Sequence, residues 1–193
     1  ILIIADEKTN PRFAAADMLS QAEHDKLATA VLITTDEDFA NAVSEELEKQ
    51  IPLLSRAEIA RTSIDTRSKI FIVNTIEEAI ELSNEIAPEH LEVCVDEPLE
   101  LLSKITNAGS VFLGRNCPEA LGDYFAGTNH TLPTSGTAKF SSPLSVYDFL
   151  KKSAYTYYTA DALKKVSNKI DYFAKKEGLT AHAKSATIRF EEE

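Results

Sequence analysis

Short apolar runs alternate along the chain with longer segments in which apolar side chains recur at helical spacing. Runs of about 4–8 residues are typical of strands, whereas a repeat of three to four residues is typical of helices. The expected strands cover residues 1–5, 29–34, 69–73, 90–95 and 110–113. The expected helices cover residues 11–28, 36–54, 56–64, 75–87 and 97–105. Strands and helices therefore alternate as far as residue 113.

Two apolar strands joined by a helix form a βαβ unit, and the strands of such a unit pair in parallel. We therefore expect an α/β body with a Rossmann-like parallel sheet flanked by helices. From residue 145 the spacing is helical, and Gly178 is placed to end one helix before the next begins. The chain thus divides into a body, residues 1–144, and a helical tail, residues 145–193. So small a tail buries little by itself, and we expect it to form a dimer contact.

The length and charge of the chain exclude several classes of protein. Its 193 residues suit one domain, or one domain with a small appendage. A net charge of −11 argues against binding to nucleic acid or to an anionic membrane, and no apolar run approaches the ~20 residues of a membrane span. The two cysteines, Cys94 and Cys117, lie in unrelated contexts and indicate reduced thiols of a cytoplasmic protein. The chain begins without Met inside an expected strand, so we expect it to be part of a longer polypeptide.

Most of the polar chemistry lies between residues 108 and 145, a stretch rich in Gly, Pro, Ser, Thr and Asn. Gly and Pro recur too often there for a long helix. The stretch follows the apolar strand at 110–113, and open α/β sheets bind ligands where loops leave the carboxyl ends of strands. Asp123, Asn129 and His130 are therefore candidate site residues at that end of the sheet. The Gly-containing run at 134–137 lacks the spacing of a phosphate-binding loop.

The chain has four histidines, and each lies beside acids, amides or small residues. Gln21 and His24 are three residues apart on an expected helix, so they face the same way and suit either a zinc ion or a solvated helix surface. Glu89 and His90 lie at the entrance of an expected strand, where a carboxylate and an imidazole form an acid–base pair or simply lie in a turn.

Further candidates lie beyond the fifth strand. Asp123 follows Gly122, and this carboxylate suits a metal ligand or a loop cap equally. Glu177 and His182 flank the expected helix junction, where an imidazole also serves as a cap. These residues alone make a metal-dependent site possible without deciding it.

Five segments of the chain, taken in order, resemble histidinol dehydrogenase. They are 21–25 (QAEHD), 84–92 (NEIAPEHLE), 108–114 (AGSVFLG), 118–133 (PEALGDYFAGTNHTLP) and 177–182 (EGLTAH). Members of that family are zinc enzymes that oxidise L-histidinol to L-histidine in two NAD-dependent steps through an aldehyde. The resemblance is to the C-terminal portion of the family and covers essentially the whole chain.

The resemblance implies a role for each of these residues. It implies the zinc ligands Gln21, His24, Asp123 and His182. It implies that Glu89 and His90 are the catalytic acid–base pair. It implies a substrate site made of Gln21, His24, His90, Asp123, His130, Glu177 and His182. It also implies a homodimer in which the tail of one chain completes the zinc site of the other.

The family's NAD contacts belong mostly to an N-terminal half that this sequence does not contain, so the cofactor-binding residues are unknown here. We therefore expect the isolated chain to bind zinc without turning over histidinol. Two alternatives stay open. One is a related zinc and NAD dehydrogenase of another alcohol, against which His130 and Glu177 argue. The other is a non-catalytic metal-binding module.

Overall fold

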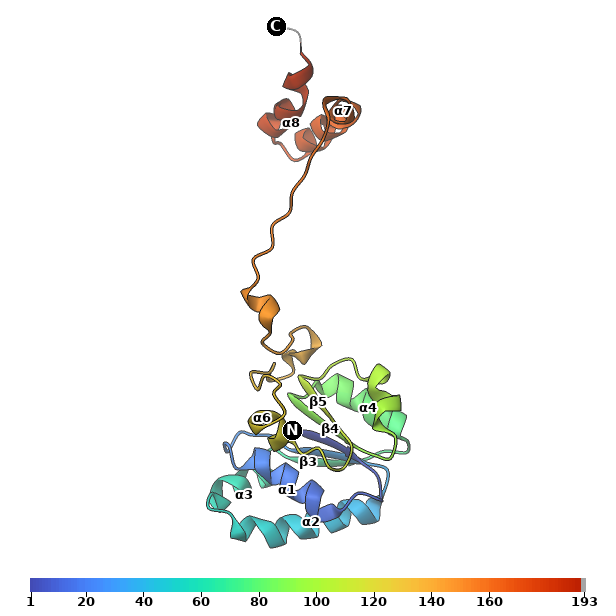
Figure 1. Cartoon of the computed structure of the whole chain (residues 1–193), viewed down its shortest axis with the longest axis vertical. Helices are drawn as coiled ribbons and strands as arrows, with labels where there is room; N and C mark the ends of the chain where they lie inside the picture. The colour runs from blue at the N-terminus through green and yellow to red at the C-terminus, as the bar shows by residue number, and fades with distance from the viewer. Residues whose placement is uncertain (192–193) are drawn as a thin grey trace. The chain divides into compact units, whose positions relative to one another are not determined.

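The computed structural model describes residues 1–191, which form two compact units. The first unit is Ile1–Phe149, and the second begins at Leu150 (Figure 1). The first unit holds the expected sheet, and the second consists of helices after an irregular segment. Among the described residues, no helix is both long and apolar enough to cross a membrane.

The first unit is built on a five-stranded parallel sheet with strand order β3-β2-β1-β4-β5. The strands are β1 (Leu2–Ala5), β2 (Val31–Thr34), β3 (Lys69–Ile72), β4 (His90–Cys94) and β5 (Ser110–Leu113). β1 lies at the centre, where Ile3 is in register with Leu32 of β2 and with Glu92 of β4. The structure confirms the expected parallel α/β sheet, because each short apolar run forms a strand of that sheet.

Helices cover both faces of this sheet (Figure 1). They are α1 (Pro11–Ala22), α2 (Glu37–Gln50), α3 (Ala57–Thr66), α4 (Ile76–Ile86), α5 (Pro98–Leu101) and α6 (Glu119–Tyr124). Side chains alternate along a strand, so Ile3 packs with α1, α2 and α3, whereas Leu2 and Ile4 pack with α4 on the other face. Two separate apolar layers therefore fix the sheet between its helices.

Local sequence signals account for the starts of several helices. Asp36 caps α2, because its side chain accepts a hydrogen bond from the Phe39 backbone N–H at 2.6 Å. Thr75 caps α4 through the Glu78 N–H at 3.2 Å, and the Glu78 carboxylate in turn accepts the N–H of Asn74 at 2.8 Å. Both helices therefore begin at a side-chain cap, and Asn74 takes part in the second one.

The first helix is shorter than its pattern predicts. The periodic residues suggest a helix over 11–28, but α1 ends at Ala22. Asp25 forms a turn there, with its carboxylate accepting the Leu27 N–H at 2.8 Å and its carbonyl accepting the Ala28 N–H at 3.0 Å. His24 therefore lies in the turn after the helix, and the expectation that it shares a helix face with Gln21 is wrong.

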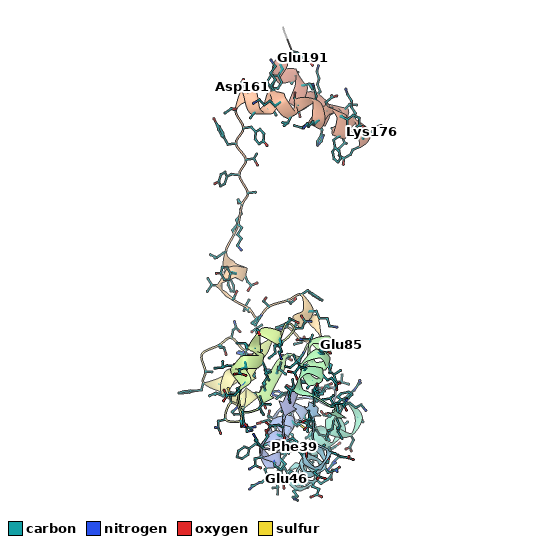
Figure 2. The ribbon with its side chains drawn as sticks, turned by 90° about the vertical axis from the view of Figure 1, so that its right-hand side faces the viewer. Phe39, Glu46, Glu85, Asp161, Lys176 and Glu191 are labelled. Carbon is teal, nitrogen blue, oxygen red and sulfur yellow. The ribbon has the colours of Figure 1, made fainter. Side chains whose placement is uncertain are left out.

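The second unit contains α7 (Ala160–Lys176) and α8 (Thr180–Thr187), which pack against each other. Figure 2 labels Asp161 and Lys176 near the two ends of α7. Gly178 adopts a φ of +77° between the two helices, a conformation that favours glycine, so the expected junction is confirmed.

The expectation of helical structure from residue 145 is wrong as far as residue 159. Only Val146–Phe149 forms a 3-10 turn, and residues 150–159 have no regular structure. This segment is rich in Ser, Thr and Tyr, and Tyr155 and Tyr157 are 94% and 84% exposed. A short helix depends on packing of its apolar face, which these exposed side chains lack here.

Candidate active site at the amino end of the sheet

The side chains with catalytic potential gather where β4 begins, at the amino end of the sheet. His90 is the first residue of β4, and α6 lies against Phe112 of β5. The Phe112 ring also packs against the His90 imidazole, with the ring centroids 5.9 Å apart. The expectation of a site at the carboxyl ends of the strands is therefore wrong for Asp123, which approaches His90 at the opposite end.

The carboxyl end of the sheet is filled by an ion-pair network centred on Arg115. Its guanidinium donates to both carboxylate oxygens of Asp6 at 2.6 Å and to Asp96 at 2.7 Å. Its Nε donates to Thr9 Oγ1, and the Thr9 hydroxyl donates to the Cys94 carbonyl. These residues follow β1, β4 and β5, so the network takes the place between β1 and β4 where open parallel sheets usually bind ligands.

His90 faces two carboxylates of α6. Its Nε2 lies 3.7 Å from Glu119 Oε1 and 3.8 Å from Asp123 Oδ1. Both distances allow ion pairing but are too long for hydrogen bonds, and neither imidazole nitrogen has a hydrogen-bond partner among the described residues. His90 and Glu119 are only 6% and 3% exposed. The three groups offer nitrogen and oxygen atoms within 4.8 Å of one another, which is compatible with a shared cation.

Helix α6 is held in place by β4 and by α1. The N–H of Glu119 donates to Glu92 Oε1 of β4 at 2.7 Å, which caps the helix where Pro118 cannot. Ser20 of α1 donates its hydroxyl to Glu119 Oε2 at 2.8 Å. Glu119 and Asp123 are four residues apart, so their side chains lie on the same face of α6. These contacts aim both carboxylates at His90.

Behind this cluster lies a second pair of acids, Asp17 and Glu92. Burial raises the pKa of Glu92 to about 8, and the neighbouring charge of Asp17 adds to the effect. Burial likewise raises the pKa of Asp17 to about 6. Burial lowers the pKa of His90, against the opposing charges of Glu119, Glu89 and Asp123. The imidazole is therefore held in its neutral form, which is the form that accepts a proton.

A pocket of about 340 Å³ opens at the same end of the sheet. Gln21 and Glu89 both line it, so the structure brings together one expected zinc ligand and one expected catalytic residue. The chain reaches Glu89 through Ala87, whose φ of +55° turns it sharply after α4. A Cβ atom on Gly109 would lie 2.5 Å from the Glu89 carbonyl oxygen, so Gly109 permits this close approach.

The remaining expected site residues lie outside this cluster. His24 and His130 are exposed, and no interaction described for their side chains joins them to His90. Asn129 shapes its own loop, because its carboxamide accepts the Thr131 N–H at 2.7 Å and donates to the Leu144 carbonyl.

Glu177 and His182 belong to the second unit, which is described by itself. Both line an apolar pocket of about 500 Å³ beside α7, together with Phe173. The structure therefore brings these two expected residues together on one face of the second unit.

Comparison with known proteins shows the family to which this chain belongs. A family model described as histidinol dehydrogenase matches residues 1–190. The chain belongs to the histidinol dehydrogenase family. The resemblance stated from its motifs is thereby confirmed.

Individual family members agree over the whole chain. Histidinol dehydrogenases of Bacillus cereus and of Listeria monocytogenes serotype 4b are 57% and 58% identical to it over 193 residues. Each alignment covers 100% of this chain and 45% of the relative. A crystal structure of histidinol dehydrogenase from Elizabethkingia anophelis matches with a TM-score of 0.85 and 40% identity, over 97% of this chain and 43% of that one. The chain thus spans about 45% of the length of these curated relatives.

Sequence reasoning missed Glu119, although it lies in the centre of the cluster. Its partner Asp123 was recognised, but the i, i+4 pair was hidden because residues 108–145 were taken for a loop. A signal was nevertheless present in Glu92, an acid within an otherwise apolar strand. A buried acid needs partners, and its partner here is the first turn of α6.

Proposed function

We propose that the chain carries the zinc and acid–base residues of an enzyme that oxidises L-histidinol to L-histidine through histidinal, with NAD as oxidant. One observation carries this proposal beyond family membership: the buried His90 imidazole lies 3.8 Å from the carboxylate of Asp123. A proton acceptor thereby sits beside the carboxylate proposed to hold the metal.

The donor groups in the first unit fit a zinc ion. Gln21, His24 and Asp123 supply an amide oxygen, an imidazole nitrogen and a carboxylate oxygen, all of which bind zinc in proteins. The hydrogen bond from Ser20 to Glu119 joins the end of α1, next to Gln21, to the start of α6. His182 is the proposed fourth ligand. When bound, zinc supplies positive charge that holds the nitrogen atoms of the substrate.

His90 and Glu89 are the proposed acid–base residues. His90 takes the hydroxyl proton as hydride leaves the alcohol carbon, and burial favours the neutral imidazole that this step requires. Glu89 lines the pocket, where its carboxylate accepts a proton from the water that adds to the aldehyde. His130 and Glu177 are proposed to contact the substrate, beside the four zinc ligands and His90.

The same proposal includes a cytoplasmic homodimer with shared active sites, in which His182 completes the zinc site of the other chain. Two features of this chain support it. Tyr155 and Tyr157 expose their rings before α7, and His182 lies beside an apolar pocket of the second unit. The NAD contacts and the placement of this chain in the C-terminal portion of the family stay predictions.

Two kinds of sample test the proposal. The first is the 193-residue chain, and the second is a chimaera in which these residues replace the matched 45% of the Bacillus cereus relative. We expect the isolated chain to bind zinc in calorimetry without oxidising histidinol, and the chimaera to reduce NAD when given histidinol. A His90→Ala chimaera is the matched inactive control.

The results also separate the alternatives. Zinc binding by a chimaera that never reduces NAD would favour a non-catalytic metal-binding module. Turnover of another alcohol in place of histidinol would favour a dehydrogenase of different specificity. Rapid NAD-dependent turnover by the isolated 193-residue chain would contradict the expected need for a further cofactor-binding part.

A further inference from the structure

We infer that Glu119 is a positioning residue for His90, which fixes the orientation of the imidazole and the nitrogen that carries its proton. The inference rests on the proposed function, in which His90 is the proton acceptor. The contacts of Glu119, which join its helix to α1 and to β4, carry the inference.

The two carboxylate oxygens of Glu119 have different neighbours. Oε2 accepts the hydroxyl hydrogen of Ser20 at 2.8 Å, which fixes the side chain from the α1 side. Oε1 is then left pointing at His90, 3.7 Å from Nε2. The side chain of Glu119 is 4% exposed, so water does not compete for this oxygen. A carboxylate fixed in this way needs little reorganisation when the charge on the imidazole changes.

The backbone of Glu119 is fixed as firmly as its side chain. Its N–H donates to Glu92 Oε1 at 2.7 Å, two residues along β4 from His90. The strand that carries the imidazole therefore also anchors the helix that carries the carboxylate. Motion of β4 moves both groups together, which preserves their separation.

Asp123 lies almost as close to His90 Nε2 but cannot replace Glu119 in this role. Its side chain is 24% exposed, against 4% for Glu119, and in the proposed function its carboxylate holds the metal. Glu119 is then the carboxylate left to face the imidazole. With carboxylate oxygens on the Nε2 side, the neutral ring carries its hydrogen on Nε2 and its lone pair on Nδ1.

The first test is Glu119→Gln, which keeps the size of the side chain and an oxygen for the Ser20 hydroxyl. Its NH2 group would face His90 Nε2 and favour the opposite tautomer, with the hydrogen on Nδ1. In ¹⁵N spectra of the histidine-labelled 193-residue chain, we expect the His90 hydrogen on Nε2 before the change and on Nδ1 after it. Glu85→Gln, on the exposed surface of α4, is the control and should leave the spectrum unchanged.

The second test is kinetic and uses the chimaera. We expect Glu119→Gln to lower kcat for histidinol by roughly 100-fold, the lower end of what a positioned acid–base group contributes. KM and zinc affinity should stay within about twofold, because in the proposed function Glu119 contacts neither the substrate nor the zinc ion. Ser20→Ala should lower kcat by a smaller factor, whereas Ser20→Thr keeps a hydroxyl and should restore most of it.

Three outcomes would overturn the inference. The first is an unchanged His90 spectrum in a folded Glu119→Gln chain. The second is an unchanged kcat in the chimaera. The third is a fall in zinc affinity as large as that of Asp123→Asn, which would make Glu119 a metal ligand. If the unmodified chimaera fails to oxidise histidinol, the proposed function fails, and the His90 spectrum still decides whether Glu119 positions the ring.

Discussion

Gly122 packs directly against the ring of Phe112, and a Cβ atom at Gly122 would lie 2.6 Å from the ring edge. Real Cβ atoms do not approach another carbon so closely, and the Phe112 side chain is 5% exposed with little room to move. The same ring packs on His90. Gly122 therefore sets the distance between α6 and β5, and with it the placement of Glu119 and Asp123.

Gly122→Ala should destabilise the first unit and disturb the cluster together. Overpacking of a buried contact costs about 1–3 kcal/mol of unfolding free energy. We also expect weaker zinc binding, because the shifted helix carries Asp123. Gly127→Ala is the control: its φ of +82° makes alanine strained, but nothing lies within 4 Å of the new Cβ atom. Urea unfolding measures the stability of each variant, and calorimetry measures its zinc affinity. Normal zinc affinity in Gly122→Ala would contradict the argument.

The buried acids predict that stability falls as pH rises. Folding raises the pKa of Glu92 from 4.5 to about 8, chiefly by burial and then by the charges of Asp17 and Glu119. The folded chain therefore holds a proton that the unfolded chain releases, so this stabilisation is present below pH 4.5 and is lost as pH rises towards about 8. His90, on the same strand, is held neutral by burial, so it adds no positive charge to offset the negative charges of Asp17 and Glu92.

Glu92→Gln should flatten this pH dependence. The amide oxygen still accepts the Glu119 N–H, but the group no longer titrates. We expect the variant to lose less unfolding free energy than the unmodified chain between pH 4.5 and about 8, measured by urea unfolding at several pH values. Glu85→Gln, on an exposed face of α4, should behave as the unmodified chain. A pH dependence in Glu92→Gln equal to that of the unmodified chain would refute the assignment.

The sheet was predictable from the sequence because each strand is a short apolar run bounded by turn residues. Asp36 and Thr75 were recognisable as helix caps because capping depends on neighbours three residues away. The segment after residue 145 was not predictable in this way. Its helical spacing needs an apolar partner surface, and Tyr155 and Tyr157 have none within the described chain.

The candidate site was predictable by residue type but not by position. His90 and Asp123 were recognised, yet their contact depends on α6 lying against Phe112, which no local pattern reveals. The polar loop after β5 predicts a site at the carboxyl end of the sheet, but Arg115 and its carboxylate partners fill that end. Glu119 was missed because its importance comes only from contacts distant in sequence.

Glu89→Gln in the chimaera should impair oxidation of the aldehyde more than oxidation of the alcohol. Only the aldehyde step requires a water molecule to lose a proton, and an amide does not accept that proton. Rates measured separately with histidinol and histidinal check this, with His90→Gln as the comparison that should slow the alcohol step. Equal losses in the two steps of Glu89→Gln would refute the role proposed for this residue.

The last prediction is that His182 serves the zinc site of the partner chain. Asp123 and His182 belong to different units of this chain, so nothing in either unit requires both ligands of one site to come from one molecule. In a two-fold dimer with exchanged tails, each site takes Asp123 from one chain and His182 from the other. Inactive Asp123→Ala and His182→Ala chimaeras should therefore regain activity when their subunits exchange.

The expected recovery follows from counting sites. Random exchange makes about half of the dimers mixed, and each mixed dimer has one intact site of two, so activity should reach about one quarter of normal. A mixture of Asp123→Ala with Gln21→Ala is the control, because both residues lie in the first unit and every site then keeps one lesion. Mass spectrometry of the intact dimers confirms that subunits exchange. If the mixture of Asp123→Ala with His182→Ala then stays as inactive as this control, each tail supplies His182 to its own chain.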